Sequence, residues 1–440
     1  MRFKHSRFVS LMFAVVAGAA AMPHLSAQMP GMPAMENSAG TISSGTSLEP
    51  AAASEASSMI HGSLGSWSVM FHANAFIQDI QQSGPRGGDK FFSTSWFMPM
   101  LTNQWGPHSL TLRTMISLEP ATVTHRRYPL LFQSGETAFG LPIVDGQHPH
   151  NLFMEIAGRY DFDLSDTARL FFYGGPIGEP ALGPVAFPHR SSASENPVAV
   201  LGHHEQDSTH LSYSVITAGL SAGPVQLEAS AFHGQEPTEN RWYIGTGKPD
   251  SYSARVTASP SRNVSGQFSI GRINNREAHE PGLDTLRMTA SIQHNKSLAS
   301  GSLASSIIWG RNNDMIDAEE RIFNSYTVES TLNFKDRNWI WTRIENLDKD
   351  RTLLYGEVPA ALDVEETPIG RVQSYSFGYE RDIFRTQLWA NIGLGAQFTA
   401  YGMTDEMNTV YGDRPKSFVV FLHIRPVGNL SAHMRAMHGH

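Results

Sequence analysis

The chain has 440 residues, a formal net charge of −8 and no cysteine. The absence of cysteine excludes disulfide scaffolds, thiolate metal sites and cysteine nucleophiles. A net negative charge without a long run of Lys or Arg argues against nucleic acid as a partner. The 38 glycines, 10% aromatic residues and only 17% charged residues are typical of a β-rich protein.

Residues 1–27 have the composition of a secretory signal peptide. Arg2, Lys4 and Arg7 precede an apolar stretch over residues 8–22, and a small-residue site ends at Ala27. We expect cleavage after Ala27. No other stretch stays apolar for about 18 residues, which excludes a helical membrane protein. The exported chain is then either soluble or inserted in a membrane as a β-barrel.

Residues 28–65 are rich in Ser, Ala, Gly, Pro and Met and lack a periodic apolar face. Such a segment cannot bury enough surface to fold alone, so we predict a disordered leader that faces the periplasm. Met29, Met32 and Met35 offer thioether sulfur, which suits weak capture of copper.

From Trp67 onward, short runs alternate apolar and polar residues. Leu227 and Ala229 face one way, for example, while Gln226 and Glu228 face the other. This period of two predicts β-strands with one polar and one apolar face.

The connections between these runs alternate short and long through about seven cycles, as in outer-membrane barrels with short periplasmic turns and long extracellular loops. The long ones include residues 119–150, 176–208 and 234–250, and a moderate one spans residues 312–320. We therefore predict an all-β fold for residues 66–440: a single antiparallel transmembrane β-barrel of about 16 strands, in a range of about 14–18. The alternative is a soluble β-sandwich.

The polar faces of the predicted strands carry charges of both signs. A barrel interior needs inward polar residues, so we expect these side chains to line the lumen or to form a lattice of salt bridges inside it. The predicted lumen residues are Arg113, Glu155, Arg159, Glu228, Arg255, Arg343 and Glu345.

Histidines gather in or beside three consecutive long loops, together with Glu205, Asp207 and Glu236. Imidazole and carboxylate are ligands that suit Zn, Cu and Ni, so these loops predict a site for copper or another divalent metal. The predicted ligands are His148, His150, His189, His203, His204, Glu205, Asp207, His210 and His233. The alternative is that these histidines fix the loops through hydrogen bonds to backbone and carboxylates.

The segment Gly219–Gly223 matches the G-x-S-x-G pattern of serine hydrolases. That mechanism requires a strand, a sharp turn and a helix. Here Pro224 follows and a strand resumes at Val225. We interpret the segment as a hairpin turn and expect no enzyme, with an outer-membrane lipid hydrolase as the least favoured reading.

Three segments carry a resemblance to known proteins: DGQHPHNLFMEIA (145–157), FPHRSSASENPVAVLGHHEQDSTH (187–210) and HGQEPTENRW (233–242). In these segments the chain resembles a family of bacterial outer-membrane or envelope β-barrel proteins associated with copper and heavy-metal resistance systems. The resemblance covers nearly the whole mature chain. It implies an exported barrel with a role in metal handling, and it supplies no established ligands.

These observations favour an outer-membrane porin-like channel linked to metal tolerance, in a Gram-negative cell. The alternative is a non-conducting barrel or soluble β-protein that sequesters metal at its loop histidines. The expected partners are outer-membrane lipid and lipopolysaccharide, the outer-membrane assembly machinery, and small solutes or metal ions.

Overall fold

The computed structural model describes residues 36–37, 40–55, 59–277, 280–316, 319–355, 369–386 and 390–429, all within one compact unit spanning Glu36–His440. The predicted signal peptide and Met29, Met32 and Met35 lie outside the described residues. None of the described helices is long and apolar enough to cross a membrane.

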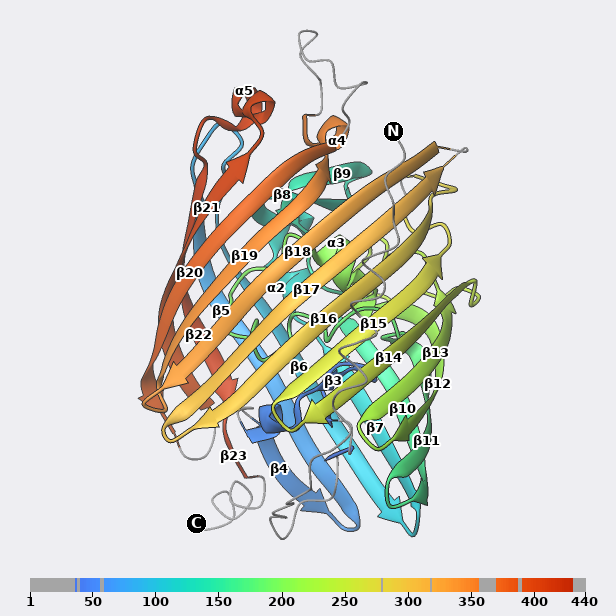
Figure 1. Cartoon of the computed structure of the whole chain (residues 1–440). Coiled ribbons are helices and arrows are strands. Elements are labelled where there is room, and N and C mark those ends of the chain that lie inside the picture. Colours follow the sequence, from blue (N-terminus) through green and yellow to red (C-terminus); the bar gives the residue numbers. More distant parts are fainter. Residues whose placement is uncertain are drawn as a thin grey trace. The chain divides into compact units, whose positions relative to one another are not determined.

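The described strands form a closed barrel of sixteen long strands, each antiparallel to its neighbours (Figure 1). At the seam, the last long strand pairs with the first, from Ser417↔Gln82 to Ile424↔Ala75. Two short strands, β4 (Met59–Leu64) and β23 (Gly428–Asn429), extend the sheet beside this seam. The predicted all-β barrel of about 16 strands is confirmed.

The sixteen strands are β5 (Trp67–Gln82), β6 (Asp89–Trp105), β7 (His108–Ile116), β10 (Phe153–Ser165), β11 (Ala168–Gly178), β12 (Ser212–Ala222), β13 (Val225–His233), β14 (Ser251–Ser261), β15 (Val264–Ile273), β16 (Asp284–Leu298), β17 (Gly301–Ile316), β18 (Glu319–Phe334), β19 (Asn338–Asp350), β20 (Ile369–Arg385), β21 (Ala390–Met403) and β22 (Lys416–Pro426). The remaining elements are β1 (Glu36–Asn37), β2 (Gly40–Ile42), β3 (Leu48–Glu49), β8 (Tyr128–Ala138), β9 (Leu141–Gln147), the helices α2 (Glu119–Thr122), α3 (His203–Gln206), α4 (Arg351–Tyr355) and α5 (Asn408–Tyr411), and the 3-10 turns η1 (Ala51–Glu55), η2 (Thr124–Arg126), η3 (Ser208–His210) and η4 (Asp405–Met407).

The barrel wall is apolar outside and polar inside. On β13, Leu227 is 53% exposed on the outer face, whereas its neighbours Gln226 and Glu228 are buried on the inner face. Adjacent β14 repeats the pattern, with Val256 outside and Arg255 inside. Alternation with the apolar face outward is the arrangement of a transmembrane barrel, because lipid rather than water covers the outer face.

One end of the barrel has short turns and the other carries the long loops. The structure differs from the predicted alternation of short and long connections between β17 and β18, because β17 runs to Ile316 and β18 begins at Glu319. The moderate connection predicted over residues 312–320 is therefore wrong: residues 312–316 pair with β18 as strand residues. The segment Gly219–Gly223 lies in β12 and the following turn, where Gly223 has a φ of +55°.

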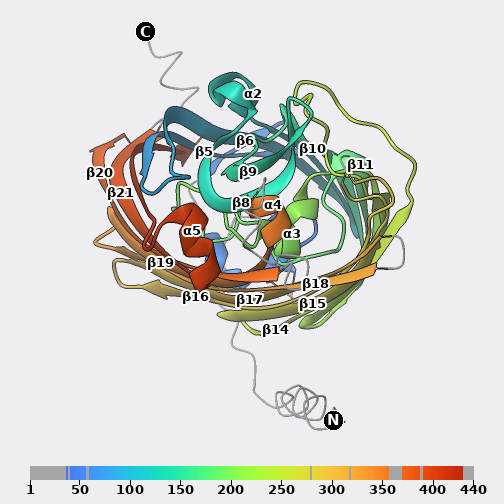
Figure 2. The ribbon, with the colours of Figure 1, turned by 90° about the horizontal axis from the view of Figure 1, so that it is seen from above.

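The 117–152 loop, with β8 and β9, folds into the barrel from the long-loop end, and two further segments fill much of the interior. One is the β11–β12 loop (residues 179–211), which contains α3; the other is the stretch of residues 40–55 before the first wall strand. Seen from above, α3 and the β8–β9 pair lie within the ring of wall strands (Figure 2). Most residues of both segments are buried.

The prediction of an unstructured leader over residues 28–65 is wrong for residues 40–55 and for β4. Residues 40–55 have few large apolar side chains and form no core of their own. They are held by the wall instead: the hydroxyl of Thr46, for example, accepts a hydrogen bond from the Arg255 side chain at 2.9 Å. The wall partner Gln226 also donates to the backbone carbonyl of Thr46 at 3.0 Å. The barrel wall thus supplies the partners that the segment lacks.

Apolar side chains close the long-loop end. Phe132 from β8 stacks on Tyr411 from α5, with ring centroids 4.3 Å apart. Leu131 and Leu354, from β8 and α4, are fully buried in the same cluster. These loops therefore share a hydrophobic core with inward-facing wall residues such as Phe76 and Trp341.

A charge on the outer face of the wall tests membrane insertion. Ile307 is 61% exposed near the middle of β17, so Ile307→Arg should lower the free energy of unfolding by about 2–4 kcal/mol. Leu298→Arg, at the short-turn end of β16, is the matched control and should cost about 0–1 kcal/mol. Urea-dependent folding into phospholipid vesicles measures both, and equal small losses would contradict a lipid-facing β17.

Candidate functional site: a buried histidine cluster

Five of the predicted histidines meet inside the barrel. The ring centroids of His203 lie 5.3 Å from His204, 5.1 Å from His210 and 6.4 Å from His148. His150 joins the group at 5.5 Å from His210. They come from two loops, residues 117–152 and 179–211, that both fold inward from the long-loop end.

Wall residues hold α3, which presents two of these histidines. The backbone N–H of Gly202, just before α3, donates to Glu345 at 3.1 Å. The carbonyl of His204 accepts from Asn312 at 3.1 Å and also from Arg287. Gly135, with a φ of +130°, lets β8 pass close to the His204 ring, where a Cβ would lie 2.5 Å from Nε2. A single short helical turn is thereby held in one orientation.

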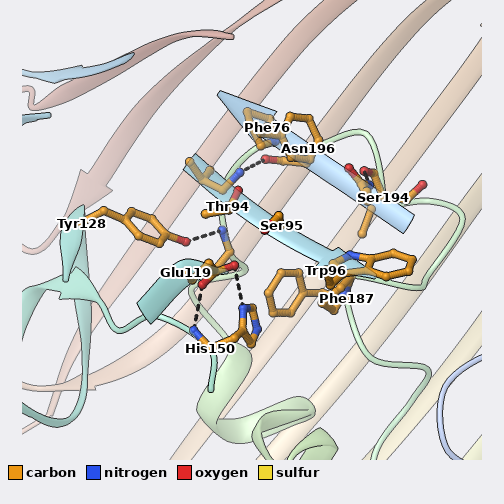
Figure 3. Close-up of a pocket in the computed structure, with 16 residues that line it drawn as sticks. Phe76, Thr94, Ser95, Trp96, Glu119, Tyr128, His150, Phe187, Ser194 and Asn196 are labelled. Atoms are coloured by element: carbon orange, nitrogen blue, oxygen red, sulfur yellow. Dashed lines mark hydrogen bonds and ion pairs between the residues drawn. The ribbon is translucent and has the colours of Figure 1, made fainter. Parts of the chain in front are cut away.

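Most of these imidazoles use Nδ1 for a local polar contact. Nδ1 of His203 lies 2.6 Å from Asp207, and Nδ1 of His210 lies 2.8 Å from the Asp207 carbonyl. Nδ1 of His150 lies 3.0 Å from Glu119, as Figure 3 shows. Metal-binding histidines commonly pair one ring nitrogen in this way, which fixes the tautomer and the ring orientation.

Two further carboxylates stand beside the cluster. Nε2 of His148 lies 3.1 Å from Glu136, which also forms an ion pair with Arg241. Glu119 and Glu136 are ligand partners that the sequence did not predict. Neither belongs to a motif, and each reaches the histidines only because the 117–152 loop folds back on itself.

Burial keeps most of the cluster uncharged. Burial and the neighbouring His204 and His203 hold the pKa of His148 well below its usual value. Burial likewise lowers the pKa of His203, and it lowers that of His210 to about 3. His150 is the exception, because Glu119 outweighs the effect of burial and raises its pKa. Neutral imidazole is the form that binds metals.

Four predicted ligands stand apart from the histidine cluster or have other contacts. His189 packs on Trp96, with centroids 4.4 Å apart, and near His72 instead of in the cluster. His233 lies on β13 with Nδ1 3.1 Å from Asp250. Asp207 serves His203 and Arg190 and so orients a ring. Glu205 is buried on α3, and its Oε2 has no hydrogen-bond partner.

The structure places all seven predicted lumen residues, Arg113, Glu155, Arg159, Glu228, Arg255, Arg343 and Glu345, buried on the inner face of the wall. Several pair across neighbouring strands, such as Arg113 with Glu155 at 2.7 Å and Arg255 with Glu228 at 2.9 Å. Others bind the interior segments: Arg343 donates to the Val198 carbonyl at 3.1 Å. These residues form a lattice of ion pairs and hydrogen bonds that holds the interior segments against the wall.

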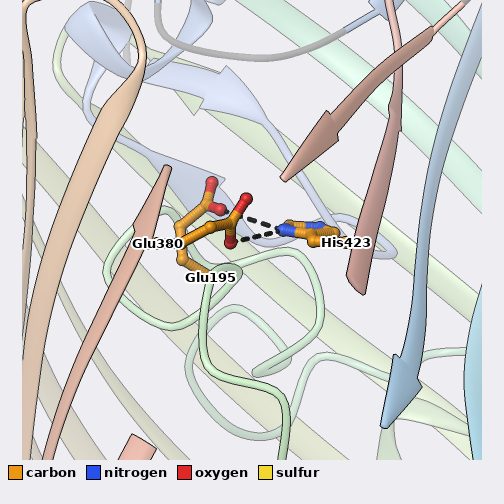
Figure 4. A group of neighbouring side chains, drawn as sticks. All are labelled: Glu195, Glu380 and His423. Carbon is orange, nitrogen blue, oxygen red and sulfur yellow. Dashed lines mark hydrogen bonds and ion pairs between the residues drawn. The ribbon is translucent and has the colours of Figure 1, made fainter. Parts of the chain in front are cut away.

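A second cluster, which the sequence did not predict, joins the 179–211 loop to the wall. Nδ1 of His423 lies 2.9 Å from Glu380 and 3.3 Å from Glu195 (Figure 4). Arg425 forms ion pairs with both glutamates. Arg425 and His423 thus pair with glutamates from both the loop and the wall, so this cluster fastens the loop to the wall.

No protein-family model and no curated protein sequence matches the chain. Solved structures with a similar fold include an anion-selective porin from Comamonas acidovorans, with 10% identity, 82% of this chain and 99% of that chain covered, and a TM-score of 0.48. A Salmonella typhi OmpF complex with daunomycin has 8% identity, covers 81% and 98%, and gives a TM-score of 0.47. A loop L8 deletion mutant of OmpT, an outer-membrane protein of Vibrio cholerae, has 9% identity, covers 81% and 99%, and gives 0.45.

The pair of His150 and Glu119 predicts a pH-dependent stability. A group whose pKa is raised on folding stabilises the protein below its unfolded pKa, near 6.5, and that contribution is lost as the pH rises through the folded pKa. Glu119→Gln should therefore lower the free energy of unfolding more at about pH 6 than at about pH 9. Urea unfolding at the two pH values measures this. The exposed Glu320→Gln is the control, and an equal loss from Glu119→Gln at both values would contradict the prediction.

Proposed function

We propose that this protein is an outer-membrane porin-like barrel with a constricted lumen that passes only small polar solutes or ions. The apolar outer face and polar inner face support insertion in a membrane as a closed barrel. The secretory signal predicted from the sequence at residues 1–27 supports export of the chain to that membrane.

The 179–211 loop carries the constriction, because it is bonded to the wall at many points around the barrel. On one side Asn74 and Gln78 of β5 donate to the carbonyls of Ser194 and Pro197 at 3.0 and 3.1 Å. On other strands, the loop backbone donates to Ser230 at 2.8 Å and to Ser269 at 2.9 Å, and Lys349 donates to the Leu201 carbonyl at 3.0 Å. A loop held on β5, β13, β15 and β19 crosses the lumen instead of lining one side.

Residues 40–55 narrow the path further toward the short-turn end. Ser47 donates to Glu179 at 2.8 Å, and Ser191 donates to Glu49 through its backbone N–H at 2.7 Å. The two interior segments therefore bind each other as well as the wall. Solutes would pass through polar gaps between them, or after one segment moves.

Metal handling is a second candidate function, in which the barrel binds copper or another divalent metal as part of metal tolerance. The convergence of five imidazoles from two loops favours it, because four of them are held by nearby carboxylates and three have lowered pKa values. Buried neutral imidazoles held in fixed orientations suit a metal ion better than they suit a solvated loop.

Planar-bilayer conductance tests the constriction. Replacing residues 187–206 with a short Gly-Ser linker should raise single-channel conductance several-fold, because it removes the part of the loop that crosses the lumen. The matched control inserts the same linker at Gly106, in an exposed turn at the opposite end, and should leave conductance low. Folding of each variant is checked by the mobility shift between boiled and unboiled samples. Equal conductance of the linker variant and the unaltered protein would refute a constricting loop.

A further inference from the structure

We propose that His204, Glu236 and Glu277 form a binding site for one divalent transition-metal ion, with Zn²⁺ as the reference ion. The three residues come from α3, the β13–β14 loop and the β15–β16 loop. The biological use of this site rests on the proposed role in metal handling. The site itself is inferred from the geometry of these side chains. Two of the three ligands, Glu236 and Glu277, were not predicted as ligands from the sequence.

The donor atoms already stand close together. One ligand atom from each of the three residues lies within 4.8 Å of the other two. Nδ1 of His204 is 3.4 Å from Oε1 of Glu236, which is long for a hydrogen bond. Zinc binds nitrogen and oxygen at roughly 2.0–2.2 Å, which puts two tetrahedral donors about 3.4 Å apart. Glu277 then needs only a small side-chain movement to complete three protein ligands.

The backbone fixes the two glutamates relative to each other. The N–H of Glu236 donates to the carbonyl of Arg276 at 2.9 Å, which ties one loop to the residue next to Glu277. His204 is fixed from the other side by Gly135, as described above. The ligands are therefore placed by three segments that are themselves bonded to one another, as a preorganised site requires.

Two carboxylate oxygens here lack protein partners. Oε2 of Glu236 and Oε2 of the adjacent Glu205 are both buried with no hydrogen-bond partner. The side chains of His204 and Glu236 are 7% and 8% exposed. Buried polar atoms are nearly always paired, so a group of unpaired ones at one place points to a missing ligand.

A cavity of about 80 Å³ reaches this site and gives an ion room to enter. It touches His204, Glu205 and Glu277, and its wall carries more acidic than basic groups. The acidic residues are Glu205, Glu277, Glu280, Asp314, Asp348 and Asp350, and the basic residues are Arg276, Arg321 and Lys349. An acidic, low-dielectric cleft attracts cations and raises their local concentration.

Two cations beside the ligands are engaged with other groups: Arg287 donates to the His204 carbonyl and to Ser208, and Asp314 holds the end of Arg276. The two terminal nitrogens of Arg276 bind Asp314 at 3.2 and 3.1 Å, and its Nε forms an ion pair with Glu277 at 3.3 Å. The other close group of this kind among the described residues, Glu195, Glu380 and His423, differs in this respect, because Arg425 is paired with both of its glutamates.

The donor set selects the class of ion. One imidazole and two carboxylates suit borderline divalent ions such as Zn²⁺, Co²⁺ or Mn²⁺, and the absence of sulfur ligands disfavours Cu⁺. Glu205, whose Oε2 has no hydrogen-bond partner, lines the same cavity as His204 and Glu277.

Titration of Zn²⁺ into the metal-free, detergent-solubilised protein by calorimetry tests the site. We expect one ion per chain, and at least a tenfold loss of affinity in both His204→Ala and Glu236→Gln. Co²⁺ added as a spectroscopic probe should show a tetrahedral or five-coordinate absorption band that both variants lose. His233→Ala is the control on a histidine outside the cluster and should bind as the unaltered protein does.

His203→Ala separates this ligand set from the wider cluster. It removes an imidazole that is paired with Asp207 and should leave Zn²⁺ affinity within a few-fold of the unaltered protein. Unchanged affinity in His204→Ala, or equal loss in His203→Ala, would overturn the proposed ligands. All variants are first checked for the mobility shift of the folded barrel. If a variant does not fold, Glu236→Asp replaces it, and this variant should retain part of the Zn²⁺ affinity because it keeps the carboxylate.

The proposed channel is tested apart from the site, because conductance is recorded both with and without Zn²⁺. A constricted channel that binds no Zn²⁺ refutes the site alone. A protein that binds Zn²⁺ through the triad but conducts nothing in any variant keeps the site and refutes the channel.

Discussion

The buried carboxylate of Glu329 on β18 holds the interior of this protein together. Its Oε1 accepts from Arg190 of the 179–211 loop at 2.5 Å, and its Oε2 accepts from Arg343 of β19 at 3.1 Å. Arg190 in turn reaches Asp207, which orients His203. Removing one partner from such a buried network costs roughly 3–5 kcal/mol, because it leaves an uncompensated charge. The loop, the wall and the histidine cluster therefore depend on the same chain of charges.

This network of charges is needed because the wall has its apolar face outside and its polar face inside, the reverse of a water-soluble protein. A barrel of sixteen strands encloses more space than its own side chains can fill, and its inner face is polar. The polar groups must be satisfied by water or by protein. Here the 179–211 loop and residues 40–55 supply much of the pairing, through backbone carbonyls and N–H groups that a loop would otherwise expose to solvent.

The sequence predicted the wall well because strand alternation and loop rhythm are local properties. The loops that carry the predicted ligands follow one another along the chain. Five of their histidines meet inside the barrel, whereas His189 and His233, which were predicted with them, lie apart. Other features depend on contacts between residues far apart in sequence. Glu136, for example, is an isolated acid until β8 folds back toward His148. Composition misled the prediction for residues 40–55, because the partners that order this segment lie about 200 residues away, as with Thr46 and Arg255.

The threading of residues 40–55 through the interior constrains how the barrel can be assembled. This segment is made before every wall strand, yet its partners lie on β13, β14 and β15. The contacts that fix it span most of the chain, so they form late and slow the folding reaction. The seam between β5 and β22 joins the two ends of the wall, and its closure seals whatever has already docked inside. An assembly factor that held this seam open would thus control when the interior is filled.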